Sequence, residues 1–347
     1  MSVKVPDTMS EIDWAAYFDP DWLALHQEPI IEPDLPIVDP HHHLWPWSNY
    51  GVAQYLADLR AGHDVRATVY LESGLAYRET GPEHLRTVGE IEYVLNLLAD
   101  PLLAEPGAPN MCAGIIGAVN FDDPPERVDE ALAAQAAAAK GRFKGIRLNA
   151  MWDPDFGWAD VGPERLGSAT MRQGFAMMQR HDLVCDLMVF HPQLPQVPDF
   201  ANAFPGTTIV LNHLGGVSEL GARAGRHEEV LAEWKAGIGA LVACPNIMVK
   251  LGGLNNGHFS GWRFNEDPLP PSSQMLAEAY RPYVEFAIER FGPERCMFES
   301  NYPADKSHCS YPVLWNAFKR LAGSCSAEEK QALFSGTAAR VYTLRDI

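Results

Sequence analysis

The chain has 347 residues, and 47% of them are hydrophobic, which is enough for a large core and excludes a disordered protein. Its 45 acidic residues outnumber 27 basic ones and give a formal net charge of -18, which repels nucleic-acid phosphates and anionic membrane surfaces. Because α/β barrels reach this length as one domain, we expect one large domain and a small-molecule partner rather than a nucleic acid or a membrane.

The cysteines and the N-terminal segment bear on the cellular compartment. The 6 cysteines form no CxxC pair, and several lie in apolar runs, which is typical of buried free thiols under reducing conditions. The N-terminal segment has no apolar stretch like that of a secretory signal, and no apolar run approaches the length of a membrane span. We therefore expect a cytoplasmic protein, and the sequence leaves a homo-oligomer open.

The first elements in the chain are an arm and a strand. Residues 1–36 combine prolines, acids and aromatics, which predicts an N-terminal arm with one short helix packed on the main body. Residues 37–347 are expected to form a single domain. This domain opens with an apolar run at Ile37 that leads into Asp39 and three consecutive histidines, as when a buried strand emerges into a polar site.

Strand patterns and helical patterns then alternate to the end of the chain. Apolar or β-branched runs indicate strands at residues 37–43, 67–72, 111–119, 143–149, 183–191, 207–213, 246–251 and 295–301. Helical patterns between them include residues 50–63, 91–98, 125–140 and 284–291, and a capping box at Ser326 opens the last helix. Eight strand–helix repeats predict an α/β protein with a distorted (β/α)8 TIM barrel and an N-terminal arm.

Polar residues gather where the predicted strands end. His41 and His43 share one face of the first strand, whereas His42 points away, because side chains alternate along a strand. His191 and His213 end two later strands, and the C-terminal strand ends of such a barrel encircle one cavity. A single strand-end histidine is more often structural, but four that converge indicate a metal or catalytic site.

Several motifs make the chain resemble the amidohydrolase superfamily, and within it the lactonase-like hydrolases of amidohydrolase family 2. The resemblance runs from about residue 35 to the C-terminus. It rests on the ordered set Asp39-x-His41-x-His43, Phe190-His191-Pro192-Gln193-Leu194-Pro195, Ile209-Val210-Leu211-Asn212-His213-Leu214-Gly215-Gly216, Met297-Phe298-Glu299-Ser300-Asn301-Tyr302-Pro303 and Phe334-Ser335-Gly336-Thr337-Ala338-Ala339-Arg340-Val341-Tyr342.

The resemblance implies ligand positions and one departure from the family. The family places an aspartate at the strand-eight position, where this chain has Asn301, whose amide cannot accept a catalytic proton near neutral pH. Glu299 shares the face of Asn301, and Asp305 follows in the next loop, so either acid can replace the missing aspartate. The alternative is that Glu299 forms a buried structural ion pair with Lys250 or Arg147. We assign metal binding to His41, His43, His191 and Glu299, and catalysis to Glu299, Asn301, His213 and Asp305.

Other side chains are candidates for substrate binding. Arg147 suits a planar contact with a carboxylate, which favours an anionic substrate, although an ion pair with Glu72 is the alternative. The long segment 254–273 is expected to form a lid or binding wall, or to pack on the arm. The substrate-binding set is Arg147, Glu72, His258, Trp262 and Tyr302.

These expectations define a function and its alternatives. We expect a catabolic hydrolase that opens a lactone or related carbonyl compound with one divalent metal ion, zinc before manganese. By the resemblance, Lys144 and Lys250 are candidates for the carbamylated lysine of some binuclear amidohydrolases. Lys144 is expected to face away from Arg147, so we favour a mononuclear or weakly metallated centre. In a metal-free site the same histidines would polarise the carbonyl directly. The alternatives are a metal-dependent decarboxylase of aromatic acids and a binding protein on a barrel that has lost its activity.

Overall fold

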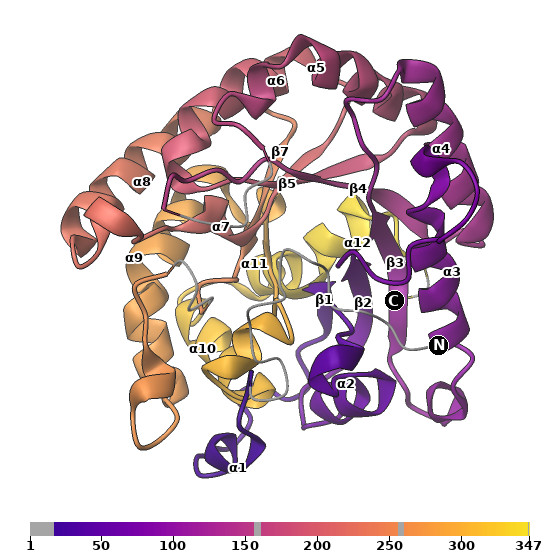
Figure 1. Ribbon diagram of the computed structural model, residues 1–347. Coiled ribbons are helices and arrows are strands. Elements are labelled where there is room, and N and C mark those ends of the chain that lie inside the picture. Colours follow the sequence, from indigo (N-terminus) through magenta and orange to yellow (C-terminus); the bar gives the residue numbers. More distant parts are fainter. Residues whose placement is uncertain (1–16, 156–160, 256–259, 346) are drawn as a thin grey trace.

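The computed structural model describes residues 17–155, 161–255, 260–345 and 347. Its eight strands form one parallel sheet in chain order, from β1 to β8, at the centre of the molecule (Figure 1). The strands are β1 (Ile37–His42), β2 (Val65–Leu71), β3 (Asn110–Gly117), β4 (Phe143–Asn149), β5 (Val184–Met188), β6 (Ile209–Leu211), β7 (Ile247–Leu251) and β8 (Cys296–Phe298).

The helices lie mostly around this sheet (Figure 1). They are α1 (Pro20–Leu23), α2 (Val52–Leu59), α3 (Val88–Leu97), α4 (Pro125–Ala138), α5 (Ala169–Phe175), α6 (Val197–Ala203), α7 (His213–Gly216), α8 (His227–Leu241), α9 (Ser273–Phe291), α10 (Tyr311–Leu321), α11 (Ala327–Gln331) and α12 (Thr337–Val341). Helix α11 begins with the expected capping box, in which the Ser326 hydroxyl accepts from the backbone N–H of Glu329 at 3.2 Å. The predicted (β/α)8 barrel is confirmed.

The barrel closes just beyond the last strand. No ladder joins β8 to β1 within the described sheet, but the segment after β8 meets β1 through backbone hydrogen bonds. The N–H of Asn301 donates to the carbonyl of His41 at 3.0 Å, and the N–H of His43 donates to the carbonyl of Tyr302 at 2.7 Å. The predicted distortion therefore lies at this seam, and the seam brings the strand-one histidines beside the strand-eight acid.

A segment near the C-terminus fills the opposite end of the barrel. Tyr342, which follows α12, is fully buried and packs with side chains from the start of several strands. These side chains are Val38, Ala67, Val184, Val210, Met248 and Met297. Parallel strands buried on both faces read as nearly continuous apolar runs, which is why the side chains around Tyr342 in this cluster are apolar.

The described part of the N-terminal region contacts α10. Asn316 accepts from the N–H of Ile31 at 2.8 Å and donates to the Glu28 carboxylate at 2.8 Å. Lys319 donates to the carbonyl of Glu32 at 2.7 Å. The division into an arm of residues 1–36 and one barrel domain stays a prediction. Of the helices in the described ranges, none has both the length and the apolarity to cross a bilayer.

Candidate active site

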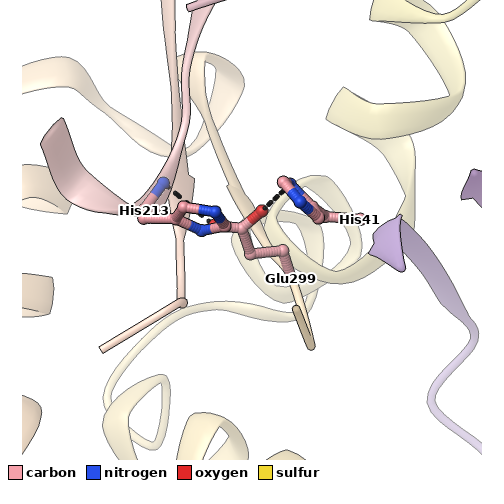
Figure 2. Close-up of side chains that lie close together, drawn as sticks. All are labelled: His41, His213 and Glu299. Carbon is pink, nitrogen blue, oxygen red and sulfur yellow. Dashed lines mark hydrogen bonds and ion pairs between the residues drawn. The ribbon is translucent and has the colours of Figure 1, made fainter. Parts of the chain in front are cut away.

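A buried carboxylate lies between two histidines at the C-terminal end of the barrel (Figure 2). Oε2 of Glu299 is 2.8 Å from Nδ1 of His41, and Oε1 is 2.8 Å from Nδ1 of His213. The backbone N–H of His213 also donates to Oε1 at 3.0 Å. Each of the three offers a possible ligand atom, and these atoms lie within 4.8 Å of one another. The cluster unites β1, β6 and β8.

The glycines after β7 make room for this cluster. Gly253 has a φ of +64°, and a Cβ added there would lie 2.0 Å from Nδ1 of His213. A Cβ on Gly252 would lie 2.6 Å from Cγ of Glu299. At Gly253 only glycine combines this backbone conformation with such a close approach. The two glycines after β7 thus leave the space that His213 and Glu299 occupy.

The two outer histidines of the triplet face each other, as strand alternation predicts. Nδ1 of His43 lies 2.9 Å from the carbonyl oxygen of Leu71, which only accepts, so Nδ1 carries the proton and Nε2 is bare. That Nε2 is 3.3 Å from Nε2 of His41. His42 points the other way and contacts the hydroxyl of Thr68 at 2.9 Å.

This pair of imidazoles has the chemistry of a divalent-metal site. Two nitrogens bound to one tetrahedral zinc lie roughly 3.3 Å apart, which the two Nε2 atoms match. Burial, and after it the charge of Lys250, holds the pKa of His41 well below its usual range. Burial and the charge of Arg147 do the same for the pKa of His43. Both rings are therefore neutral, the form that binds metals.

A buried ion pair that the sequence argument did not assign to the site lies beside His41. Nζ of Lys250 donates to Oδ1 of Asp186 at 2.5 Å and lies 3.3 Å from Nδ1 of His41. Both charged residues have no exposed surface. The signal that could have found them is a charge inside the apolar runs of β5 and β7.

The remaining strand-eight residues form a second buried pair. Nδ2 of Asn301 donates to Oδ1 of Asp305 at 2.7 Å, and the N–H of Asn255 donates to the other carboxyl oxygen at 3.2 Å. Burial raises the pKa of Asp305 to about 8, so this group holds its proton near neutral pH. The two predicted catalytic residues are thus in contact with each other.

The structural alternative for Glu299 fails among the described residues. Its ion pairs are with His41 and His213. Lys250 pairs with Asp186, as described above. Arg147 pairs with Glu72 through Nε at 2.7 Å, and its terminal nitrogen donates to the Glu72 carbonyl at 2.6 Å.

His191 lies apart from the group of three. It opens the 3₁₀ turn η8 (His191–Gln196) after β5, and its Nδ1 accepts from the N–H of Ser218 at 3.1 Å. Its Nε2 lies 3.5 Å from the carboxylate of Glu233, and burial lowers its pKa to about 4. Among the described residues, the cluster of possible metal ligands does not contain His191. The role of His191 as a metal ligand therefore stays a prediction.

The other predicted substrate residues are dispersed. Trp262 packs edge-on against Tyr280 and Tyr283 of α9, each at 5.6 Å between ring centroids. Tyr302 is buried, and its hydroxyl donates to the carbonyl of Cys309 at 2.6 Å. His258 lies outside the described residues. Their assignment to substrate binding stays a prediction.

A parallel eight-stranded barrel with neutral imidazoles and a buried carboxylate at its C-terminal end has the features of a TIM-barrel enzyme, whose active site lies at that end. The sequence matches the amidohydrolase family over residues 38–344. The chain belongs to that family, as its motifs indicated.

Individual relatives are similar over nearly their whole length. The chain is 31% identical to the uncharacterized protein y4mH of Sinorhizobium fredii, over 89% of this chain and 99% of that protein. It is 29% identical to an L-fucono-1,5-lactonase of Burkholderia multivorans, over 88% and 96% of the two chains. A crystal structure of an amidohydrolase from Burkholderia multivorans with bound HEPES superposes with a TM-score of 0.66 at 26% identity, over 89% and 99%. A second crystal form, with bound zinc, gives a TM-score of 0.66 at 24% identity over the same shares.

Proposed function

We propose that this protein is a lactonase that hydrolyses a small cyclic ester with the help of one divalent metal ion. The observation that carries the proposal is the buried carboxylate of Glu299 between His41 and His213, beside the facing Nε2 atoms of His41 and His43. The similarity to an L-fucono-1,5-lactonase supports the choice of a lactone as substrate.

In the proposed site, two histidines bind the metal ion. His41 and His43 would hold the ion through their Nε2 atoms, in which case the proton of His41 would lie on Nδ1, 2.8 Å from Oε2 of Glu299. An ion at that position polarises a carbonyl oxygen and lowers the pKa of a water molecule. Zinc is the first expectation for this nitrogen-rich site, and manganese the second.

Glu299 takes the proton that Asn301 cannot take. The backbone N–H and the imidazole of His213 contact Oε1 of the carboxylate, whereas Oε2, 2.8 Å from Nδ1 of His41, has no hydrogen-bond partner among the described residues. Oε2 can therefore accept from the attacking water. Asp305, which holds its own proton near neutral pH, fixes the amide of Asn301 beside this base. The strand-eight carboxylate of the family is thus replaced by one from two residues earlier.

Chelation followed by metal analysis tests the proposal. Protein stripped of metal is expected to lose opening of L-fucono-1,5-lactone and related sugar lactones, and added zinc or manganese to restore it. Full activity of the metal-free protein would contradict the metal centre and leave direct polarisation by the histidines. Glu299→Gln is expected to lower kcat by about 10²–10⁴-fold while the bound metal is retained.

Labelled water distinguishes hydrolysis from the decarboxylation of an aromatic acid. A hydrolase incorporates one oxygen from H₂¹⁸O into its hydroxy-acid product. Release of carbon dioxide without that incorporation would contradict the lactonase proposal. Location in the cytoplasm and a homo-oligomeric state remain predictions.

A further inference from the structure

Asp39 is the residue of the strand-one motif to which the proposed function assigns no role. It lies in β1, two residues before His41, and is fully buried. A buried carboxylate is costly unless hydrogen-bond donors surround it. Five neutral donors surround this one, namely the N–H groups of His41 and Ser300 and the hydroxyls of Ser300, Tyr55 and Tyr311.

One carboxyl oxygen of Asp39 contacts the backbone on both sides of the seam. Oδ1 accepts from the N–H of Ser300 at 3.0 Å and, more weakly, from the N–H of His41 at 3.4 Å. Ser300 directly follows Glu299 in the chain. A single oxygen atom therefore joins the backbone of a proposed metal ligand to the backbone beside the proposed base.

The seam has no strand pairing that could do this instead. β8 ends at Phe298, and no ladder joins it to β1 within the described sheet. The backbone bonds of the seam begin at Asn301, whose N–H donates to the carbonyl of His41. In a parallel ladder each such N–H donates to a carbonyl of the next strand. At Ser300 the side chain of Asp39 takes the place of that carbonyl.

The second carboxyl oxygen holds Ser300 at another point. The Ser300 hydroxyl donates to Oδ2 at 2.6 Å. The hydroxyls of Tyr55 in α2 and Tyr311 in α10 donate to the same oxygen at 2.9 Å and 3.1 Å. Because two helices outside the sheet fix Oδ2, the carboxylate has a set orientation, and Ser300 takes its place from it.

The position of the proposed base depends on this arrangement. Oε2 of Glu299 lies 2.8 Å from Nδ1 of His41 across the seam. If Ser300 moved away from β1, the Glu299 carboxylate would move with it relative to His41. A displacement near 1 Å in an active site can cost about 100-fold in rate.

We infer that Asp39 is a positioning residue that sets the Glu299 carboxylate against His41 by holding Ser300. The inference rests on the proposed function, in which Glu299 is the base. It adds a role for the buried acid of the strand-one motif. Because Asp39 acts through the base, its loss should lower turnover and leave substrate binding nearly unchanged.

A pair of variants tests this inference on L-fucono-1,5-lactone. Ser300→Ala and Tyr311→Phe each remove one hydroxyl from Oδ2 of Asp39, but only Ser300 adjoins Glu299. Ser300→Ala is expected to lower kcat at least about 10-fold with KM within about 3-fold, and Tyr311→Phe to keep both within about 3-fold. Thermal unfolding and elemental analysis show whether each variant is folded and keeps its zinc.

Substitutions of Asp39 itself extend the test. Asp39→Ala removes the acceptor of Ser300 and is expected to lower kcat about 100-fold where the variant folds. Asp39→Asn keeps an oxygen for the N–H of Ser300, and hydroxyls can rotate to accept from the new amide, so it should recover most of kcat. A folded Asp39→Ala with the kcat of the wild type overturns the inference.

A double variant separates positioning from a general loss of stability. Glu299→Gln has already lost the base, so adding Ser300→Ala should lower kcat less than about 3-fold further. Losses that multiply in full, or equal kcat values for Ser300→Ala and Tyr311→Phe, overturn the inference and leave the proposed function intact. Wild-type activity in Glu299→Gln overturns the proposed base and this inference with it.

Discussion

Glu299 and Asn301 exchange the roles expected at the end of strand eight. The acid stands two residues earlier than the family places it, and the amide contacts the protonated Asp305 instead. β8 ends at Phe298 and Asn301 has a φ of +54°, so strand alternation does not place these two side chains. The contacts of Glu299 with His41 and His213 nevertheless keep its carboxylate at the C-terminal end of the barrel. The site therefore keeps one carboxylate beside β8, between His41 and His213.

Asn301→Asp is expected to destabilise the fold in a pH-dependent way. The substitution removes the amide donor and places two carboxyl groups within hydrogen-bond distance. Near pH 5 they can share the proton of Asp305, whose pKa is about 8, but above pH 8 both are ionised and repel each other. We expect a loss of about 1–3 kcal/mol of unfolding free energy at pH 8.5, and less at pH 5, in urea titrations. The exposed Asn96→Asp is the control, and equal losses at both pH values would contradict the argument.

Arg147 tests whether the substrate carries an acidic group. Glu72 fixes its guanidinium through two contacts, so a lysine cannot reproduce its planar arrangement. Arg147→Lys is expected to raise KM for lactones with a carboxylate by about 10–100-fold and to leave KM for neutral sugar lactones nearly unchanged. Steady-state kinetics on matched pairs of substrates measures this difference. Equal increases for both kinds of lactone would assign Arg147 a structural role.

The turn after β7 is the element on which the geometry of the cluster depends most. Gly253→Ala forces a Cβ against His213 at a positive φ, so His213 and with it Glu299 must move. We expect kcat/KM to fall at least about 100-fold, since displacements near 1 Å can cost that much. Gly239→Ala in α8 is the control, because its added Cβ meets nothing within 4 Å and should raise Tm slightly. Similar activity in the two variants would contradict the argument.

The sequence predicted the strands well, but it did not always predict where each strand ends. All eight strands and their order follow from apolar runs, and β4 has the predicted bounds. The run at 183–191 instead ends at Met188, so His191 belongs to a 3₁₀ turn and faces Ser218. A polar residue just after a strand looks the same in sequence whether the strand continues or turns, so its direction could not be predicted.

Lys250 and Asp186 show a different limit of the sequence argument. A charge inside a buried strand indicates a partner, because an unpaired buried charge is costly. Apolar patterns do not reveal which partner it has, since β5 and β7 are separated by β6. Only the barrel brings the two charges together and places Lys250 beside His41. The family resemblance supplied the histidines but not this ion pair.

The whole molecule should also respond to acid through a site far from the barrel cavity. His63 is buried beside Lys319, 2.9 Å from its Nζ, and burial lowers the pKa of His63 to about 4. Its folded-state pKa lies below the usual 6.5, so its stabilisation is complete above pH 6.5 and is lost as the pH falls toward 4. We expect a loss of roughly 2–4 kcal/mol over that range. Thermal unfolding at pH 7 and 4.5 should show a smaller difference for His63→Gln than for the wild-type protein, and equal differences would contradict this assignment.

The contact between Tyr342 and Asp186 joins positions 156 residues apart. During synthesis the strands emerge in order from β1. Asp186 of β5 can form its contact with Tyr342 only after Tyr342 has left the ribosome, long after β5 itself. The end of the barrel that Tyr342 fills therefore closes last, although His41 and His43 are synthesised early. A ribosome stalled before residue 342 should expose a nascent barrel that has all eight strands and is still open at one end.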